Sequence, residues 1–448
     1  MVRRKARIGT LLNRQYTNLN IRMKKTLIAV FLLLGIMACK PQKRETNSSP
    51  FQISQNPEEE GFSTERLARI DSFFTDCVKN GLLPNAVTFI VRHDKIVHYK
   101  AFGFKNIERK EICEPNSIFR IASQTKAITS VGLMLLYEKG KFLLDDPISR
   151  YIPEFKNPTV LVHINSRDSS FTFRPAKSEI TIRQLLNHTS GIPYGNAVFD
   201  KAHIPQVNSL QPETIEEVVK KIAKMPLDHD PGEKFTYGFN TDVLGYLIEI
   251  LSGMPLDKYL QKELFEPLGM KDSYFYVPKA KENRLVTLYS KDSLSIPLYP
   301  CINSNQTFPV EGAKTYFSGG AGLVGTIDDY ARFCTMLLHG GNFMGKQILG
   351  RKTIELMTRN QIGDAEVWDY GDKFGLGFQL ISLKSLTTLP GSEGAFKWSG
   401  MYYTDYLIDP KEDLIMLMYS NVEPFVYPEE IKRKFRILVY QALISERK

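Results

Sequence analysis

Segments with the composition of β-strands lie near both ends of this chain, and a long helical middle separates them. Two β-rich runs on either side of His93-Asp94-Lys95 predict a hairpin near the start. Four more runs fall within residues 374–420, where DPKED at 409–413 predicts a turn between the last two. This layout predicts an α+β fold in which both chain ends complete one antiparallel sheet, flanked by helices, around an inserted all-helical region.

Apolar residues recur at helical spacing in several segments. The first segment, residues 63–81, stops at Gly81, and another runs from residue 121 to about Glu138. Further helices are predicted over residues 213–224, 241–252, 255–264, 328–338 and 427–446. With 448 residues, of which 43% are hydrophobic, the chain has enough apolar side chains for a large core.

The net charge of +9 is confined to the first 40 residues, which hold nine Lys and Arg residues and no acidic residue. The rest of the chain is electrically balanced, so composition gives no support for a nucleic-acid partner. From Met23, the sequence MKKTLIAVFLLLGIMACK has a basic start, a short apolar run and a cysteine, Cys39. This apolar run is too short to cross a bilayer as a helix, but it suits a signal peptide.

The stretch GIMAC resembles a bacterial lipobox, in which the cysteine is acylated and becomes the new N-terminus. We therefore predict a lipoprotein signal peptide over residues 23–38, lipidation at Cys39, and an exported bacterial lipoprotein attached to the membrane at the periplasmic face or outer membrane. An ordinary secretory signal or an uncleaved anchor is the alternative. Residues 1–22 are either an upstream extension or a longer basic region. The polar composition of residues 39–60 predicts a tether, and residues 61–448 are predicted to form the folded domain.

No metal or cofactor site is predicted. The sequence lacks the G-x-S-x-G, H-E-x-x-H and G-x-x-x-x-G-K-[ST] motifs, and its histidines and cysteines do not cluster. His188, in LLNHTSG, is interpreted as a structural hydrogen-bonding residue. The cysteines after Cys39 have no short spacings and predict buried thiols: Cys77, Cys113, Cys301 and Cys334.

Ser123 precedes Lys126 by three positions in IASQTKAIT, at the start of a helix predicted to be buried. Positions i and i+3 share one face of a helix, so the amine can reach the hydroxyl. A serine becomes a nucleophile when a base takes its proton, and a lysine of lowered pKa can be that base. The same spacing recurs at Ser445 and Lys448 in the C-terminal tail. Spacing alone therefore also fits a helix cap followed by a surface lysine.

Five segments follow one another along the chain: FRIASQTKAIT, ITIRQLLNHTSGI, PGEKFTYGFNTDVLGYLIEILSG, SGGAGLVGTIDDYARFCTMLLHGG and FKWSGMYYTDYLIDPKEDLI. In this order they resemble the serine β-lactamase and penicillin-binding protein superfamily, and most closely its class C β-lactamase-like, esterase-like branch. The resemblance covers about residues 61–445 and implies a β-lactamase/transpeptidase-like fold. The SGGAGL part of the fourth segment is interpreted as a tight glycine turn beneath the site.

The resemblance implies a role for each matching residue. Ser123 would accept the acyl group and Lys126 would be its proton partner. Tyr237, at the start of YGFN, would help to deprotonate the serine and to protonate the leaving group, which a tyrosine can do when nearby cations favour loss of its proton. Asn240 would bind Lys126 or a substrate amide.

The third box of the family falls on the strand that contains FKWSG. Trp398, Ser399 and Gly400 would bind the substrate there, and the backbone N–H groups of Ser123 and Met401 would form the oxyanion hole.

Two positions depart from the family pattern. Its second box is commonly Tyr-x-Asn, but here Phe239 takes the third position and Asn240 comes one residue later. Its third box commonly begins with Lys or His, whereas Trp398 stands here; the adjacent Lys397 would point to the other face of a strand. A cation at this place would hold a substrate carboxylate, while a tryptophan suits an uncharged acyl or alcohol group. A core aromatic is the other interpretation of Trp398.

The favoured hypothesis is an exported serine hydrolase that forms an acyl-enzyme on Ser123, most closely a carboxylesterase acting on a small ester. One alternative is a β-lactamase or D-amino-acid peptidase that acts on cell-wall-related amides. The other is a catalytically silent binding lipoprotein of the same fold.

Overall fold

The computed structural model of the protein describes residues 51–164, 170–195, 204–205, 210–368, 371–427 and 429–445. The predicted extension over residues 1–22, the signal peptide over 23–38, and Cys39 lie outside these residues. Within the described residues, no helix is both long and apolar enough to cross a membrane.

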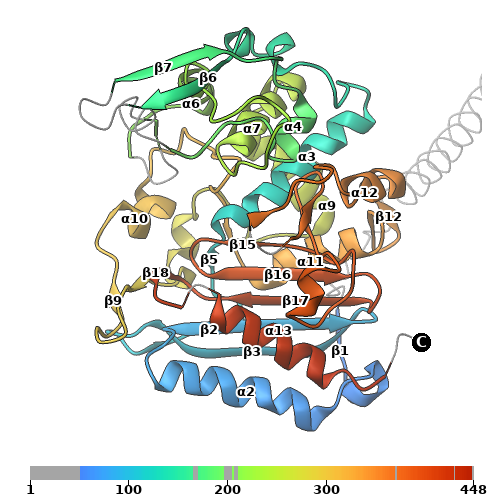
Figure 1. Cartoon of the computed structure of the whole chain (residues 1–448). Helices are drawn as coiled ribbons and strands as arrows, with labels where there is room; N and C mark the ends of the chain where they lie inside the picture. The colour runs from blue at the N-terminus through green and yellow to red at the C-terminus, as the bar shows by residue number, and fades with distance from the viewer. Residues whose placement is uncertain are drawn as a thin grey trace, which may run out of the picture. The chain divides into compact units, whose positions relative to one another are not determined.

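A sheet assembled from both ends of the chain forms the centre of the fold (Figure 1). In the described part of the chain its strands are, in spatial order, β1 (Gln52–Ile53), β3 (Lys95–Asn106), β2 (Asn85–Arg92), β17 (Leu414–Tyr419), β16 (Thr404–Asp409), β15 (Phe396–Gly400), β14 (Gln379–Leu380) and β13 (Lys373–Phe374), with β4 (Glu111–Ile112) paired to β3. These pairings are antiparallel, apart from the parallel pair β1–β3. The predicted α+β fold is therefore confirmed.

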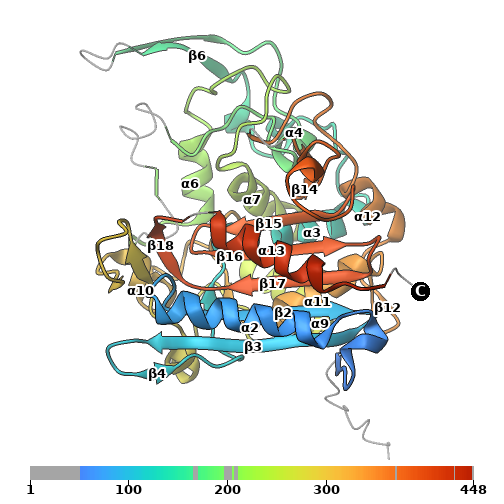
Figure 2. The same cartoon turned by 60° about the horizontal axis from the view of Figure 1, so that its bottom comes forward.

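Both faces of this sheet are buried, which explains why its central strand β17 is apolar throughout. Successive side chains of a strand point to opposite faces. Leu414, Met416 and Met418 pack in a core with α2 (Thr64–Lys79) and α13 (Glu430–Ala442). These two helices lie side by side across one face (Figure 2). Residues Ile415, Leu417 and Tyr419 belong to the larger core on the other face, which includes α11 (Ile327–Leu338).

The helical middle lies beyond the β15 side of the sheet (Figure 1). Its helices and those near it are α3 (Thr125–Glu138), α4 (Ile182–Leu186), α6 (Ile215–Ile222), α7 (Asn240–Ser252), α8 (Leu256–Leu260), α9 (Glu266–Leu268), α10 (Ser304–Glu311) and α12 (Arg351–Met357). Short 3-10 and π turns are η1 (Pro57–Glu60), η2 (Ala122–Gln124), η3 (Ile148–Arg150), η4 (Pro153–Phe155), η5 (Gln261–Phe265), η6 (Lys279–Arg284) and η8 (Ser385–Thr387).

Four small sheets complete the described structure. Their strands are β5 (Phe119–Arg120) with β10 (Val324–Gly325), β6 (Thr159–Ile164) with β7 (Phe171–Pro175), β11 (Asn342–Phe343) with β12 (Lys346–Gln347), and β8 (Tyr289–Lys291) with β9 (Tyr299–Pro300) and β18 (Val422–Phe425).

The predicted hairpin is β2–β3, and its two-residue turn needs a left-handed backbone at both positions. His93 and Asp94 have φ values of +50° and +60°. The DPKED turn, predicted at 409–413, joins β16 to β17 as expected.

The ordered fold begins earlier than the predicted boundary at Gly61. Residues 51–60 were assigned to the tether, but Phe51 is buried in the main core and β1 pairs with β3. Glu60 is buried as well, and it accepts a 2.6 Å hydrogen bond from Lys95 and pairs with His93. The assignment of residues 51–60 is therefore wrong, because this polar stretch gains both strand pairing and ion pairs on the edge of the sheet.

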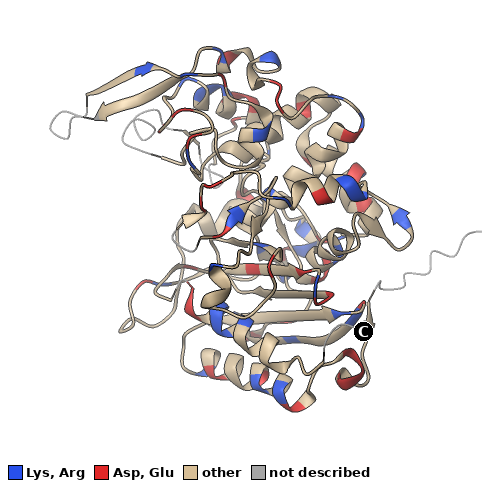
Figure 3. Cartoon of the chain, turned by 45° about the vertical axis from the view of Figure 1, so that its right-hand side comes forward, with Lys and Arg blue, Asp and Glu red and all other residues tan. Residues whose placement is uncertain are grey.

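Charge and cysteine content agree with the sequence predictions. Basic and acidic residues are interspersed along the ribbon of the described residues (Figure 3). The cysteines Cys77, Cys113, Cys301 and Cys334 are buried free thiols.

Candidate active site

Ser123 lies in the 3-10 turn η2, between strand β5 and helix α3. Ala122 takes a left-handed backbone with φ +43°, which is uncommon for a residue that has a side chain. Helix α3 begins at Thr125 with Gln124 at its N-cap, and no side chain caps it. The helix-cap interpretation of Ser123 is therefore wrong. Its hydroxyl is half-buried and pairs with Lys126.

Lys126 is buried on the first turn of α3, where its amine has three oxygen partners. It lies 3.2 Å from Ser123 Oγ, 2.6 Å from the Tyr194 hydroxyl and 2.7 Å from the Gly320 carbonyl oxygen. Together these three partners fix the position of the nitrogen. The predicted pairing of Ser123 with Lys126 is therefore present in the structure.

Tyr194 is a site residue that the sequence analysis did not identify. It follows His188 by six positions, in a loop with no periodic pattern. Its ring packs edge-on against Tyr237 and Phe239, at centroid distances of 5.2 and 4.9 Å. Burial, followed by the nearby Tyr237 and Asp242, holds the pKa of Tyr194 well above its ordinary value. Tyr194 therefore keeps its proton and acts as a hydrogen-bonding partner of the lysine.

The segment around Gly320 is held by a buried carboxylate on α7. Asp242 Oδ1 accepts hydrogen bonds from the Tyr316 hydroxyl at 2.9 Å, the Ser318 hydroxyl at 2.6 Å and the Gly320 N–H at 3.3 Å. A Cβ on Gly320 would lie 2.4 Å from Asp242 Oδ2, so only glycine allows this approach. The predicted glycine turn therefore presents the Gly320 carbonyl to Lys126.

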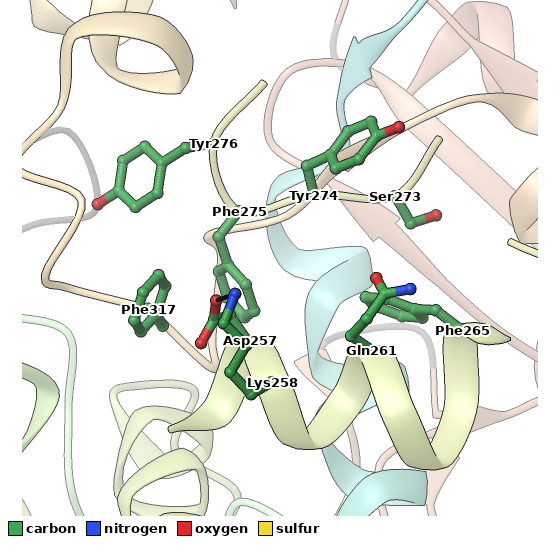
Figure 4. Close-up of a pocket in the computed structure, with 9 residues that line it drawn as sticks. All are labelled: Asp257, Lys258, Gln261, Phe265, Ser273, Tyr274, Phe275, Tyr276 and Phe317. Atoms are coloured by element: carbon green, nitrogen blue, oxygen red, sulfur yellow. Dashed lines mark ion pairs between the residues drawn. The ribbon is translucent and has the colours of Figure 1, made fainter. Parts of the chain in front are cut away.

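Aromatic side chains brace the other side of the same segment. A pocket with a volume of 210 Å³ lies here. Among its lining residues, Phe317 lies beside Phe275 and Tyr276 (Figure 4). The Phe317 ring lies 5.4 Å from that of Phe275, and the Tyr276 hydroxyl donates a 2.9 Å hydrogen bond to the Tyr316 carbonyl. The turn is thus fixed from two sides, by Asp242 and by these rings.

Tyr237 enters the site mainly through its ring, whose centroid lies 4.6 Å from Lys126 Nζ. Its hydroxyl accepts a 3.3 Å hydrogen bond from the indole N–H of Trp398. Gly238 allows this arrangement, because a Cβ there would lie 2.1 Å from the Ile192 carbonyl oxygen. The close approach of these two segments brings Tyr194 against Tyr237.

Trp398 is only 3% exposed, yet it also lines the pocket that contains Ser123. Trp398 is therefore a core aromatic that also forms part of the pocket wall, and its role in substrate binding stays a prediction. Its indole stacks on Trp368, with centroids 5.2 Å apart and planes inclined by 21°. Trp368 is 51% exposed and was not identified from the sequence. Lys397 is not among the residues that line the pocket. This agrees with the alternation of side chains along the strand, which predicted that Lys397 points to the other face from Trp398.

The end of strand β15 lies directly against the nucleophile turn. A Cβ on Gly400 would be 2.3 Å from the Ile121 carbonyl oxygen, so the two backbones can meet only because this residue is glycine. Ser399 and Gly400 line the pocket together with Met401, whose side chain is 52% exposed. Met401 therefore lines the same pocket as Ser123.

Asn240 does not lie where the resemblance predicted. Its side chain is fully buried, with its amide nitrogen 3.0 Å from His188 Nδ1 and its oxygen accepting from the Ser190 hydroxyl. The one-residue displacement puts it at the first position of α7, behind Phe239 and away from the pocket. The predicted contact with substrate or Lys126 is therefore wrong.

His188 has the structural role that was predicted for it. Burial, and then the charge of Lys126, hold its pKa well below the ordinary value, so the ring is neutral. It packs 5.0 Å from the Tyr237 ring and thereby supports that residue.

The pocket has a volume of 410 Å³ and is largely aromatic at the Ser123 end. Its lining residues in the described part of the chain are Ser123, Tyr237, Trp368, Trp398, Ser399, Gly400, Met401, Tyr403, Glu423, Pro424, Phe425, Glu429 and Lys432.

A family model for beta-lactamases matches residues 70–441. The chain belongs to the beta-lactamase family. Within this family, Protein Rv1367c of Mycobacterium tuberculosis is 32% identical over 352 residues, which cover 75% of this chain and 85% of that protein. Esterase EstB of Burkholderia gladioli is 27% identical over 372 residues, covering 79% and 90%. A candidate D-alanyl-D-alanine carboxypeptidase of Escherichia coli K12 is 26% identical over 424 residues, covering 89% and 91%.

Among solved structures, EstCE1 has the same fold. It is described as a hydrolase with promiscuous acyltransferase activity, and it matches this beta-lactamase-family chain with a TM-score of 0.72 and 25% identity over 85% of this chain and 99% of its own. The predicted β-lactamase/transpeptidase-like fold is confirmed, and the protein is a serine hydrolase of the esterase-like branch.

Proposed function

We propose that this protein is a carboxylesterase that works through an acyl-enzyme on Ser123. The Ser123 hydroxyl attacks the ester carbonyl, the alcohol leaves, and water then releases the acyl group. Lys126 Nζ, 3.2 Å from Ser123 Oγ, takes the serine proton as the neutral amine. The Tyr194 hydroxyl keeps its own proton and accepts an N–H from that amine. The backbone N–H groups of Ser123 and Met401 stabilise the oxyanion.

Tyr237 is proposed as the group that returns a proton to the leaving alcohol. Its ring lies over the Lys126 amine, and its hydroxyl is oriented by the Trp398 indole. This position, beside the lysine and on the pocket wall, suits the hydroxyl for that proton transfer.

The observation that carries the ester preference is the charge of the pocket. Lys432 is the sole Lys, Arg or His among the lining residues that the structure describes, and it is paired with Glu429 at 2.9 Å. β-Lactams and D-alanyl peptides carry a carboxylate that needs a cation, and Trp398 offers an apolar ring instead. An ester without negative charge suits these walls better.

A comparison of wild type with Ser123→Ala tests this function. We expect wild type to hydrolyse p-nitrophenyl butyrate and the variant to lose about 10³-fold or more in kcat. Ser445→Ala is the matched control, because it removes the serine of the second Ser-x-x-Lys sequence, and its activity should equal that of wild type. A chromogenic cephalosporin is assayed in parallel, and strong cephalosporin turnover with little ester turnover would favour the β-lactamase or peptidase alternative.

The silent-binding alternative requires a separate measurement. We expect a fluorophosphonate probe to add one adduct to wild type by intact mass, and none to Ser123→Ala. The absence of any adduct on Ser123, with a penicillin as well as the fluorophosphonate, would contradict the enzyme proposal.

We also propose that the protein is an exported lipoprotein anchored through Cys39. The support is the sequence from Met23 to Cys39 alone. A labelled palmitate analogue should be incorporated by the full chain in a bacterial host, and not by Cys39→Ser. Equal labelling of both proteins would contradict the proposal.

A further inference from the structure

One part of the pocket lining comes from strand β18 and the start of α13. Glu423, Pro424 and Phe425 line it from the strand, and Glu429 and Lys432 from the segment that opens the helix. The Glu423 carbonyl oxygen is engaged outside the pocket, where it accepts a 2.8 Å hydrogen bond from the Ser290 hydroxyl. The strand is therefore held by its backbone, and the carboxylate is not needed to fix it.

Glu423 differs from the other charged residues of the pocket. Lys432 is committed to Glu429 at 2.9 Å and lies 5.1 Å from the centre of the Tyr403 ring. No hydrogen bond or ion pair joins the Glu423 carboxylate to any residue in the described ranges. Burial raises the pKa of this carboxyl, which reflects the cost of holding its charge without a partner.

Aromatic rings surround the rest of the cavity. The rings of Phe425 and Tyr403 meet edge-on at 4.5 Å, and Tyr237, Trp368 and Trp398 form the wall near Ser123. A carboxylate without a partner in a cavity lined by aromatic rings is a combination that can bind an organic ammonium group, since ring faces and carboxylate both attract a cation. A metal ion fits poorly, because Ca²⁺ or Mg²⁺ needs about six oxygen ligands and one carboxylate supplies at most two.

We propose that Glu423 is a specificity-determining residue that selects substrates carrying an alkylammonium group. This inference rests on the proposed ester hydrolysis and adds the charge of the substrate. With the ester carbonyl at Ser123, a cationic group on the substrate reaches the β18 end of the same cavity and pairs with Glu423. Substrates with a carboxylate at that place are repelled by the same residue.

The test uses two esters of nearly equal shape. Butyrylcholine carries a quaternary nitrogen where 3,3-dimethylbutyl butyrate carries a carbon, and hydrolysis of both is followed by acid release. For wild type we expect kcat/KM to be about tenfold higher for the choline ester, as one ion contact of about 1.4 kcal/mol gives. Glu423→Gln keeps the size of the side chain and should bring the ratio of the two kcat/KM values to about one. Glu430→Gln is the matched control, because it removes an exposed acid of α13 that pairs with Lys434. In this variant the ratio of the two kcat/KM values should equal that of wild type.

Equal kcat/KM for the two esters in wild type, or an unchanged ratio in Glu423→Gln, would overturn the inference. Hydrolysis of neither ester by wild type would instead contradict the proposed function. A measurement that needs no turnover covers the case in which Glu423→Gln does not fold: tetramethylammonium should bind wild type in calorimetry about tenfold more tightly than tert-butanol. Equal or absent binding of the two probes would also overturn the inference.

Discussion

Replacement of Asp242 tests whether the Gly320 turn positions Lys126. In Asp242→Ala, the Tyr316 hydroxyl, the Ser318 hydroxyl and the Gly320 N–H all lose their acceptor. Each buried donor left unpaired costs about 1–3 kcal/mol, so the three together should lower the free energy of unfolding by about 3–9 kcal/mol. Asp242→Asn retains an acceptor oxygen, so its free energy of unfolding should fall by about half as much.

The activity effect follows from the geometry of the amine. If the turn relaxes, Lys126 loses the 2.7 Å hydrogen bond to the Gly320 carbonyl, which is one of its three partners. A hydrogen bond to a charged group is worth about 1.5–3 kcal/mol, so kcat for p-nitrophenyl butyrate should fall about 10- to 150-fold in Asp242→Ala. KM should change little, because Asp242 does not line the pocket.

The assay combines urea unfolding, followed by far-UV circular dichroism, with steady-state kinetics at a temperature where each variant is folded. Asp329→Asn is the control, since Asp329 is also a buried carboxylate and accepts from the Asp272 N–H and the Ser273 hydroxyl, away from Lys126. It should change stability and leave kcat unchanged. A folded Asp242→Ala protein with wild-type kcat would refute the positioning role.

The remaining predictions concern the pocket wall, the turn and one buried acid. Trp398→Lys should lower ester turnover about tenfold or more and raise turnover of a chromogenic cephalosporin, because it supplies a cation for the substrate carboxylate. A ratio of ester to cephalosporin turnover equal to that of wild type would contradict this prediction. Gly320→Ala should lose activity as Asp242→Ala does, because the new Cβ would lie 2.4 Å from Asp242 Oδ2; wild-type kcat would contradict it. Burial raises the pKa of Asp329 from 3.8 to about 6. The folded state therefore holds this proton more tightly than the unfolded chain, and the contribution of Asp329 to the free energy of unfolding falls by about 3 kcal/mol as pH rises from about 4 to about 6. Asp329→Asn should remove this part of the slope in urea midpoints measured between pH 4 and 7, and an identical slope in both proteins would contradict the prediction.

Local patterns in the sequence predicted the elements whose burial is regular. The continuous apolar sequence of β17 predicted a strand, because both of its faces are covered. The contact between Ser123 and Lys126 could be predicted from their spacing, because the two residues lie about one helical turn apart. The resemblance of the five segments to the family predicted that Trp398 lies in the same site as Ser123 and Lys126, which their spacing alone could not predict.

The parts that were missed depend on contacts between distant segments. Tyr194 and Gly320 reach Lys126 from positions 68 and 194 residues away, in loops where no periodic pattern marks the important residue. Asn240 was misplaced because one residue of displacement at the start of α7 turns its side chain from the pocket to the His188 loop. The 51–60 stretch has tether-like composition, and only its pairing with β3 orders it.

The stacked pair Trp368 and Trp398 also makes the chain its own optical reporter. These are the two tryptophans of the sequence, and both line the pocket. Intrinsic tryptophan emission from this protein therefore originates at the pocket alone, where half-exposed Trp368 meets whatever enters and buried Trp398 touches Tyr237. Formation and decay of an acyl-enzyme can accordingly be followed by stopped-flow fluorescence on the unlabelled protein, and Trp368→Phe would leave Trp398 as the single emitter.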